Sequence, residues 1–107
     1  MMGKDIKKLT EEMDEFVKSK GWYLSDSKRP QTPRNIAISL ALESSEVLEH
    51  FQWNDDRFNK EKLQDEVADV ALYLFQLCQI CDINLEEAIH QKLKQNYERQ
   101  WDQNTVK

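Results

Sequence analysis

Apolar side chains recur every three or four residues along most of this chain, a spacing that predicts helices rather than strands. The clearest stripe lies near the N-terminus, at Ile6, Leu9, Met13, Phe16 and Val17. Only two glycines and two prolines interrupt the sequence, so long helices can form without internal breaks. The pattern therefore predicts an all-α fold.

Residues that start and stop helices divide this pattern into four segments. Thr32 followed by Pro33 predicts a helix start, because threonine caps the first amides and proline suits the first turn. Asn59 and Asn84 are the corresponding caps further along the chain, and Gly21 ends the first segment. Four helices with short connections favour a four-helix bundle. The predicted helices are residues 4–20, 33–52, 60–81 and 85–101.

One connection, residues 21–31, is polar but carries two aromatic residues, Trp22 and Tyr23. Connections that carry binding residues often lie over a site that the helices hold in place. We expect this segment to fold over a site as a lid.

The composition limits the classes of partner. Fifteen basic and 20 acidic residues give a net charge of -5, which argues against a general surface for a nucleic acid polymer or an anionic membrane. The longest apolar run, residues 70–75, is too short to span a membrane, and the charged N-terminal segment has no apolar signal core. We expect residues 1–107 to form a single cytoplasmic domain.

The two cysteines, Cys78 and Cys81, have a C-x-x-C spacing within an apolar segment. A structural zinc site would need a second pair of ligands, which the sequence does not supply. We expect two reduced thiols in the core, and their reduced state fits a cytoplasmic compartment.

Two pairs of carboxylates, each spaced three residues apart, interrupt segments that otherwise have the pattern of core-facing helices. Glu43 and Glu46 form one pair, and Glu66 and Asp69 form the other. At about 100° per residue, positions three apart lie about 60° apart around a helix, so each pair shares a face. Burying an unpaired carboxylate costs roughly several kcal/mol, and these faces carry too few basic residues to neutralise four acids. The sequence therefore predicts a cation site with all-oxygen ligands, which favour Mg²⁺, with Mn²⁺ as a substitute.

Such a site is typical of phosphate chemistry, since Mg²⁺ binds through carboxylates and substrate phosphates together. A carboxylate would position or deprotonate a water molecule for attack at phosphorus while the cation neutralises the developing charge. Glu46 is our candidate for this base, within a metal-binding set that also includes Glu43, Glu66 and Asp69. The sequence alone does not separate a ligand from a base among them.

Other interpretations of the acids stay open. Carboxylate-bridged di-iron bundles need two E-x-x-H motifs, and only Glu87 with His90 has that spacing here. Glu46 lies near a helix end and could simply be exposed to water. The chain could also be a non-catalytic helical module that binds a structural or regulatory cation.

These motifs resemble the MazG-like all-α nucleoside triphosphate pyrophosphohydrolases, whose pattern is E-x-x-E followed by E-x-x-D. Within that family, the segments TPRN, LALESSEVLEHFQW, EVADVALYL and INLEEAIHQKLKQN resemble the dCTP pyrophosphatase branch, over residues 32–96. The resemblance implies a hydrolase that converts a (deoxy)nucleoside triphosphate, with dCTP or a modified pyrimidine dNTP expected, to the monophosphate and pyrophosphate. It also implies a homodimer or homotetramer, as do the long apolar helix faces.

The resemblance also implies six substrate-contacting positions: Trp53 and Tyr73 for the nucleoside, Lys92 and Asn96 for the phosphates or sugar from a neighbouring subunit, and Arg34 and Asn35 at the entrance of the site. Without the resemblance, Trp53 and Tyr73 would be taken as packing residues. The chain departs from the family at Gln31, where relatives often carry histidine. A pyrophosphohydrolase for another nucleoside triphosphate therefore stays an alternative.

Overall fold

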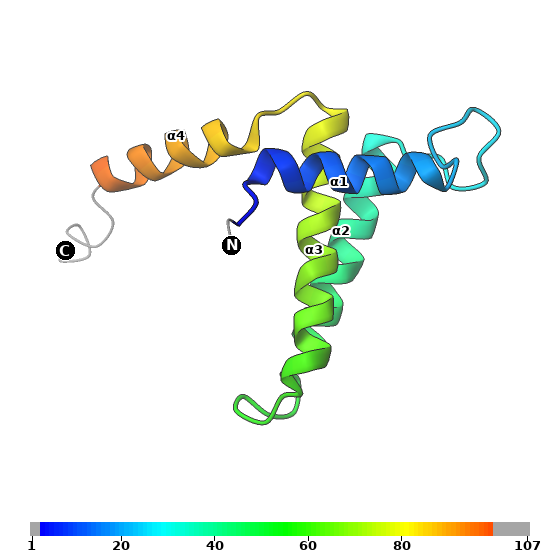
Figure 1. Ribbon diagram of the computed structural model, residues 1–107. Helices are drawn as coiled ribbons and strands as arrows, with labels where there is room; N and C mark the ends of the chain where they lie inside the picture. Colours follow the sequence, from blue (N-terminus) through cyan, green and yellow to red (C-terminus); the bar gives the residue numbers. More distant parts are fainter. Residues whose placement is uncertain (1–2, 100–107) are drawn as a thin grey trace.

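The computed structural model describes residues 3–99, and four helices without a strand in that range confirm the all-α class (Figure 1). The observed helices start within two residues of the predicted starts and end one to three residues earlier. Trp101, near which the last helix was expected to end, lies outside the described residues. The helices are α1 (Ile6–Ser19), α2 (Pro33–Glu49), α3 (Lys60–Ile80) and α4 (Leu85–Glu98).

The predicted caps open three of the four helices. The side-chain oxygens of Thr32, Asn59 and Asn84 each accept a hydrogen bond from the backbone amide three residues ahead, at 3.1, 3.0 and 3.1 Å. Each bond satisfies an amide that has no partner within its own helix. The local sequence therefore determines where these helices begin.

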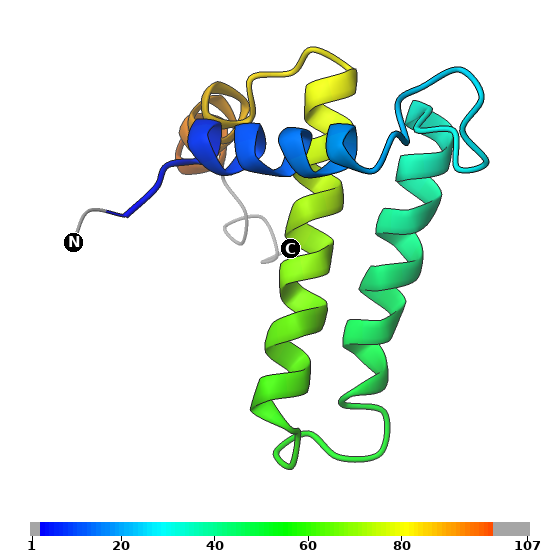
Figure 2. The same ribbon diagram turned by 45° about the vertical axis from the view of Figure 1, so that its right-hand side comes forward.

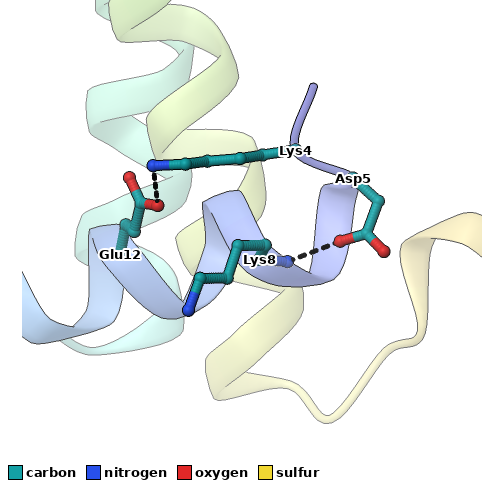
Figure 3. Close-up of polar contacts among 4 residues, drawn as sticks. All are labelled: Lys4, Asp5, Lys8 and Glu12. Atoms are coloured by element: carbon teal, nitrogen blue, oxygen red, sulfur yellow. Dashed lines mark hydrogen bonds and ion pairs between the residues drawn. The ribbon is translucent and has the colours of Figure 1, made fainter. Parts of the chain in front are cut away.

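The start of α1 has a cap that the sequence pattern did not single out. Asp5 Oδ1 accepts a hydrogen bond from the backbone amide of Lys8 at 2.8 Å (Figure 3). The Lys4 side chain reaches back over this turn and forms an ion pair with Glu12. Both side chains of the pair are about half exposed, so it adds little to stability.

The α2 and α3 helices form an antiparallel hairpin, and α1 crosses it near the end where α2 begins and α3 ends (Figures 1 and 2). The buried side chains gather where these three helices meet. They are Met13 and Val17 on α1, Ile36 on α2, and Gln76 and Cys78 on α3. The core of one chain is therefore small and lies at one end of the hairpin.

The α4 helix does not close a bundle within the chain. After α3, the backbone turns at Asp82, which has a positive φ of 55°, and α4 then runs away from the hairpin and packs on α1 (Figure 1). The radius of gyration is 17.4 Å, against about 13 Å for a compact domain of 100 residues. Because this turn directs α4 outward, the predicted four-helix bundle is not formed by a single chain.

The two cysteines differ in environment. Cys78 is buried as predicted, whereas Cys81, the C-cap residue that follows α3, is exposed. The expectation of two core thiols therefore holds for Cys78 only. None of the described helices has the length and apolar character needed to cross a membrane.

Candidate active site

The structure brings three of the four predicted acids together between α2 and α3. Carboxylate oxygens of Glu43, Glu46 and Glu66 all lie within 4.8 Å of one another. His50, the C-cap residue that follows α2, places its Nε2 atom 3.9 Å from Glu66 Oε1. The two motifs, about twenty residues apart in the sequence, thus meet because the hairpin aligns their helix faces.

Asp69 lies one turn further along α3 and is exposed. It is outside the group of three, but its negative charge contributes to raising the pKa of both Glu43 and Glu66. Glu46 and Asp69 are exposed, and Glu43 and Glu66 are half-buried, so the core-facing pattern of these segments holds only in part. For Glu46 the alternative of exposure to water is the one observed. Within the described residues, α1 packs on the hairpin near the end where α2 begins and α3 ends, which leaves Glu46 and Asp69 open to solvent (Figure 2).

Two of the carboxylates, Glu43 and Glu66, hold protons more tightly than isolated acids do, because each has a raised pKa. A hydrogen bond with Glu46 is the largest cause for Glu43, and together with burial and the neighbouring charges it raises the pKa of Glu43 to about 7. Burial is the largest cause of the raised pKa of Glu66, Glu46 adds to it, and His50 opposes it. Such acids release their protons when a cation binds among them.

One carboxylate oxygen of this group has no hydrogen-bond partner among the described residues, and a bound cation could take the place of one. Glu43 Oε2 is buried and accepts no hydrogen bond from the described residues. A buried carboxylate oxygen without a partner is destabilising, and coordination to a cation would satisfy it. With carboxylate oxygens as donors, the residues fit a hard divalent ion such as Mg²⁺ or Mn²⁺.

A pocket of about 610 Å³ adjoins the acids and shares Asp69 with them. This volume is within the range of roughly 300–1,000 Å³ that is typical of small-molecule sites. The connection between α1 and α2 forms part of the wall, and the role of residues 21–31 as a lid stays a prediction. Its Trp22 ring packs edge-on against Phe16 at 5.8 Å, and the Arg29 guanidinium lies 5.9 Å from the Trp22 ring centre.

The pocket wall includes a buried polar residue that the sequence analysis missed. Gln76 Nε2 donates a hydrogen bond to Gln31 Oε1 at 2.6 Å and makes a longer contact with the Tyr23 hydroxyl at 3.5 Å. Burial is the main cause of the raised pKa of Tyr23. Like Asp69, Gln76 is a polar residue within the apolar part of α3. This interruption of the apolar pattern is the sequence feature that could have identified Gln76.

The six positions implied by the resemblance divide into two groups. Tyr73 and Asn35 line the pocket, and Asn35 Nδ2 donates a hydrogen bond to the Pro30 carbonyl at 2.9 Å. The other positions lie elsewhere in this chain, and their roles stay predictions. Arg34 is exposed in the first turn of α2, Trp53 is 86% exposed in the connection after α2, and Lys92 and Asn96 lie on the outlying α4.

Comparison with known proteins identifies the family. A family model described as the MazG-like family matches residues 38–106, which include all four acids. The chain belongs to the MazG-like family. The resemblance found in the sequence motifs is thereby confirmed.

Two kinds of relative are similar to this MazG-like chain. The crystal structure of a pyrophosphatase from Archaeoglobus fulgidus matches with a TM-score of 0.70 and 31% identity, over 92% of this chain and 94% of that one. The dCTP pyrophosphatase 1 proteins of Mus musculus and Homo sapiens are each 30% identical over an alignment of 94 positions, which covers 79% of this chain and 52% of theirs. The chain thus spans about half the length of these curated relatives.

Proposed function

We propose that this chain is a divalent-metal-dependent pyrophosphohydrolase that converts a nucleoside triphosphate to its monophosphate and pyrophosphate. The observation that carries the proposal is the group of three carboxylates, within 4.8 Å of one another, beside a pocket of about 610 Å³. The name pyrophosphatase, which the archaeal structure and the mammalian proteins share, supports this reaction class. The mammalian names favour dCTP or a modified pyrimidine dNTP as the substrate.

The acids would hold the cation and activate water. Glu43, Glu46 and Glu66 would bind Mg²⁺ or Mn²⁺, and Asp69 lies at the border between these acids and the pocket. A cation bound there supplies positive charge that neutralises the triphosphate and the charge developing at phosphorus. Glu46 is exposed to solvent and contacts both half-buried acids, so it is placed to orient the attacking water and take its proton.

The pocket would hold the nucleoside. With the triphosphate at the acids, Asp69 marks the point where the substrate passes into the pocket. Trp22 and Tyr73 supply aromatic surface there, which suits a planar base. Asn35, held by its hydrogen bond to Pro30, would line the same chamber.

We also propose that the chain assembles as a homodimer or homotetramer. Large apolar side chains on α4 are exposed, with 41% of Ile89, 49% of Leu93 and 89% of Tyr97 accessible. Lys92 and Asn96 lie on this same outlying helix, so they would reach an active site only by packing on a neighbouring copy. The assembled protein would then complete a site that one chain leaves open.

A pyrophosphate-release assay tests the proposed reaction. Purified protein with Mg²⁺ is tested against a panel of canonical and modified dNTPs and NTPs, beside the Glu66→Gln and Glu61→Gln variants. We expect release from pyrimidine dNTPs, a loss of at least about a hundredfold for Glu66→Gln, and little change for Glu61→Gln, because Glu61 is exposed in the first turn of α3 outside the acid group.

Two other outcomes would decide against this proposal. If no nucleotide is hydrolysed but Mg²⁺ binding, measured by calorimetry, persists and depends on Glu66, the chain is a cation-binding helical module. If Glu66→Gln keeps full activity, the acid group is not the catalytic site.

A further inference from the structure

Gln76 is the buried polar residue of the described core, and it forms part of the pocket wall. It is 3% exposed and lies on α3 three residues after Tyr73 and seven after Asp69, which also line the pocket. Seven residues of helix span roughly 10 Å, so Gln76 lies well beyond the acids along the pocket. A buried amide at such a place needs partners for both its oxygen and its nitrogen.

A chain of hydrogen bonds determines which way this amide faces. The Arg29 backbone carbonyl can only accept, so the Gln31 atom at 2.6 Å from it must be the NH₂ group. Gln31 therefore turns its oxygen toward Gln76, and the Gln76 atom at 2.6 Å from that oxygen must be NH₂ as well. The oxygen of Gln76 consequently points away from Gln31, and the hydrogen bonds that Gln76 makes with the described residues Gln31 and Tyr23 both use its nitrogen.

We propose that Gln76 recognises the base of the substrate. Its Oε1 atom accepts a hydrogen bond from the 4-amino group of a cytosine base and so selects a 4-amino pyrimidine over a 4-keto pyrimidine. This inference rests on the proposed function and deepens it, because it names a specificity-determining residue at the nucleoside end of the same site. Gln31 acts as a positioning residue, since it orients Gln76 without contacting the base.

The geometry of a pyrimidine nucleotide explains why position 4 meets Gln76. The group at position 4 lies on the opposite side of the ring from the bond to the sugar. When the triphosphate is at the acids, the sugar lies near Asp69 and position 4 is directed to the far part of the pocket. Cytosine has an amino donor there, whereas uracil and thymine have a carbonyl acceptor that would face the Gln76 oxygen.

The hydrogen bond with Gln31 also prevents the Gln76 amide from rotating to suit a 4-keto base. A free amide could rotate and offer its NH₂ group to a 4-keto base. In this chain that rotation would turn the Gln76 oxygen toward the Gln31 oxygen, so that two acceptors, one of them buried, would face each other without a hydrogen bond. The hydrogen bonds from Arg29 through Gln31 to Gln76 therefore make the pocket an acceptor for one kind of base.

The experiment compares dCTP with dUTP, which share sugar and triphosphate and differ in the base. For the full-length chain with Mg²⁺, kcat/KM is measured for both substrates with the wild type and with Gln76→Leu. We expect the wild type to prefer dCTP, and the ratio of the two kcat/KM values to fall about ten- to a hundredfold in Gln76→Leu. Gln79→Leu, an exposed position one turn further on and outside this pocket, should keep the wild-type ratio.

A merely structural role for Gln76 would give a different result. If Gln76 only holds the connection that carries Gln31, both substrates lose the same factor in kcat/KM and the ratio stays unchanged, which would overturn the inference. Gln31→Leu is the second variant, useful if Gln76→Leu does not fold. It removes the partner that orients Gln76, so we expect a fall in the dCTP to dUTP ratio there as well, and an unchanged ratio contradicts the inference.

Measurements of nucleotide binding test the role of Gln76 independently of the proposed reaction. Affinities for the non-hydrolysable α,β-imido analogues of dCTP and dUTP are measured by calorimetry with the same variants. If the wild type hydrolyses nothing but binds the dCTP analogue more tightly, and Gln76→Leu removes the preference, the reaction is wrong and the base recognition stands. If nucleotides are hydrolysed without a dCTP preference, or neither analogue binds, the base recognition is wrong.

Discussion

Each carboxylate in this site owes its behaviour to the side chains next to it. Glu43 and Glu46 share a hydrogen bond, and Glu66 contacts His50 on its other side. Their shared face follows from spacing in the sequence. The raised pKa of Glu43 has its largest cause in Glu46 on the same helix, and burial is the largest cause of the raised pKa of Glu66, to which Glu46 on α2 adds. At the scale of single residues, the site is therefore a cluster of acids in which Glu43 and Glu66 bind protons more tightly than isolated carboxylates do.

The pKa of Glu43 leads to a pH-dependent stability. In the folded, metal-free chain its pKa is raised from 4.5 to about 7, so the folded state binds this proton more tightly than the unfolded state does. The free energy of unfolding should therefore decrease as pH rises from about 4.5 to about 7 and then level off. Urea unfolding with EDTA at pH 5, 6, 7 and 8 measures this decrease.

Glu43→Gln is the control for that measurement, because glutamine cannot ionise. The variant should show a smaller decrease than the wild type over the same pH range, and Mg²⁺ should reduce the decrease in the wild type. Equal pH dependence in the two proteins would show that Glu43 does not hold the proton.

At the scale of elements, short-range contacts position the walls of the pocket. The Thr32 cap defines the start of α2. Its hydrogen-bond donor is the amide of Asn35, a residue that lines the pocket. The connection before it, residues 21–31, contributes Trp22, Arg29 and Gln31 to the wall. The residues that fix the start of α2 are therefore next in the sequence to residues that form the pocket wall.

Thr32→Ala tests the contribution of this cap. The change removes the oxygen that accepts a hydrogen bond from the Asn35 amide at 3.1 Å, so the free energy of unfolding should fall by about 1 kcal/mol. Urea unfolding measures the loss. Thr32→Ser keeps the oxygen and should lose much less, whereas equal losses for both variants would show that the methyl group matters rather than the cap.

At the scale of the whole molecule, one chain leaves much apolar surface in water. Few side chains are buried, and α4 carries its apolar positions away from the hairpin (Figures 1 and 2). Burial of apolar surface is the main favourable contribution to folding and association. A chain with this shape gains most by packing α4 on a second copy, which is the basis of the oligomer proposed above.

Leu93→Glu tests this association. A carboxylate in the middle of the exposed apolar stripe of α4 should reduce the mass measured by light scattering toward the 12.8 kDa of one chain. Gln91→Glu adds the same charge at a polar position of that helix and should leave the mass unchanged. A wild-type protein that already measures as one chain, or a Leu93→Glu variant of unchanged mass, would contradict the role of this helix.

The sequence by itself determined the four helices, three of their caps, the two acidic pairs and the membership of the MazG-like family. The helices, caps and acidic pairs depend on residues within about four positions of one another, so periodicity and capping are sufficient to predict them. The family membership follows from motifs spread over residues 32–96, and the family model over residues 38–106 confirms it. The tertiary structure alone decided that α4 leaves the hairpin at Asp82, that two of the acids are exposed, and that Gln76 meets Gln31. Gln76 and Gln31 are 45 positions apart, and only the packing of α3 against the connection before α2 brings their amides together.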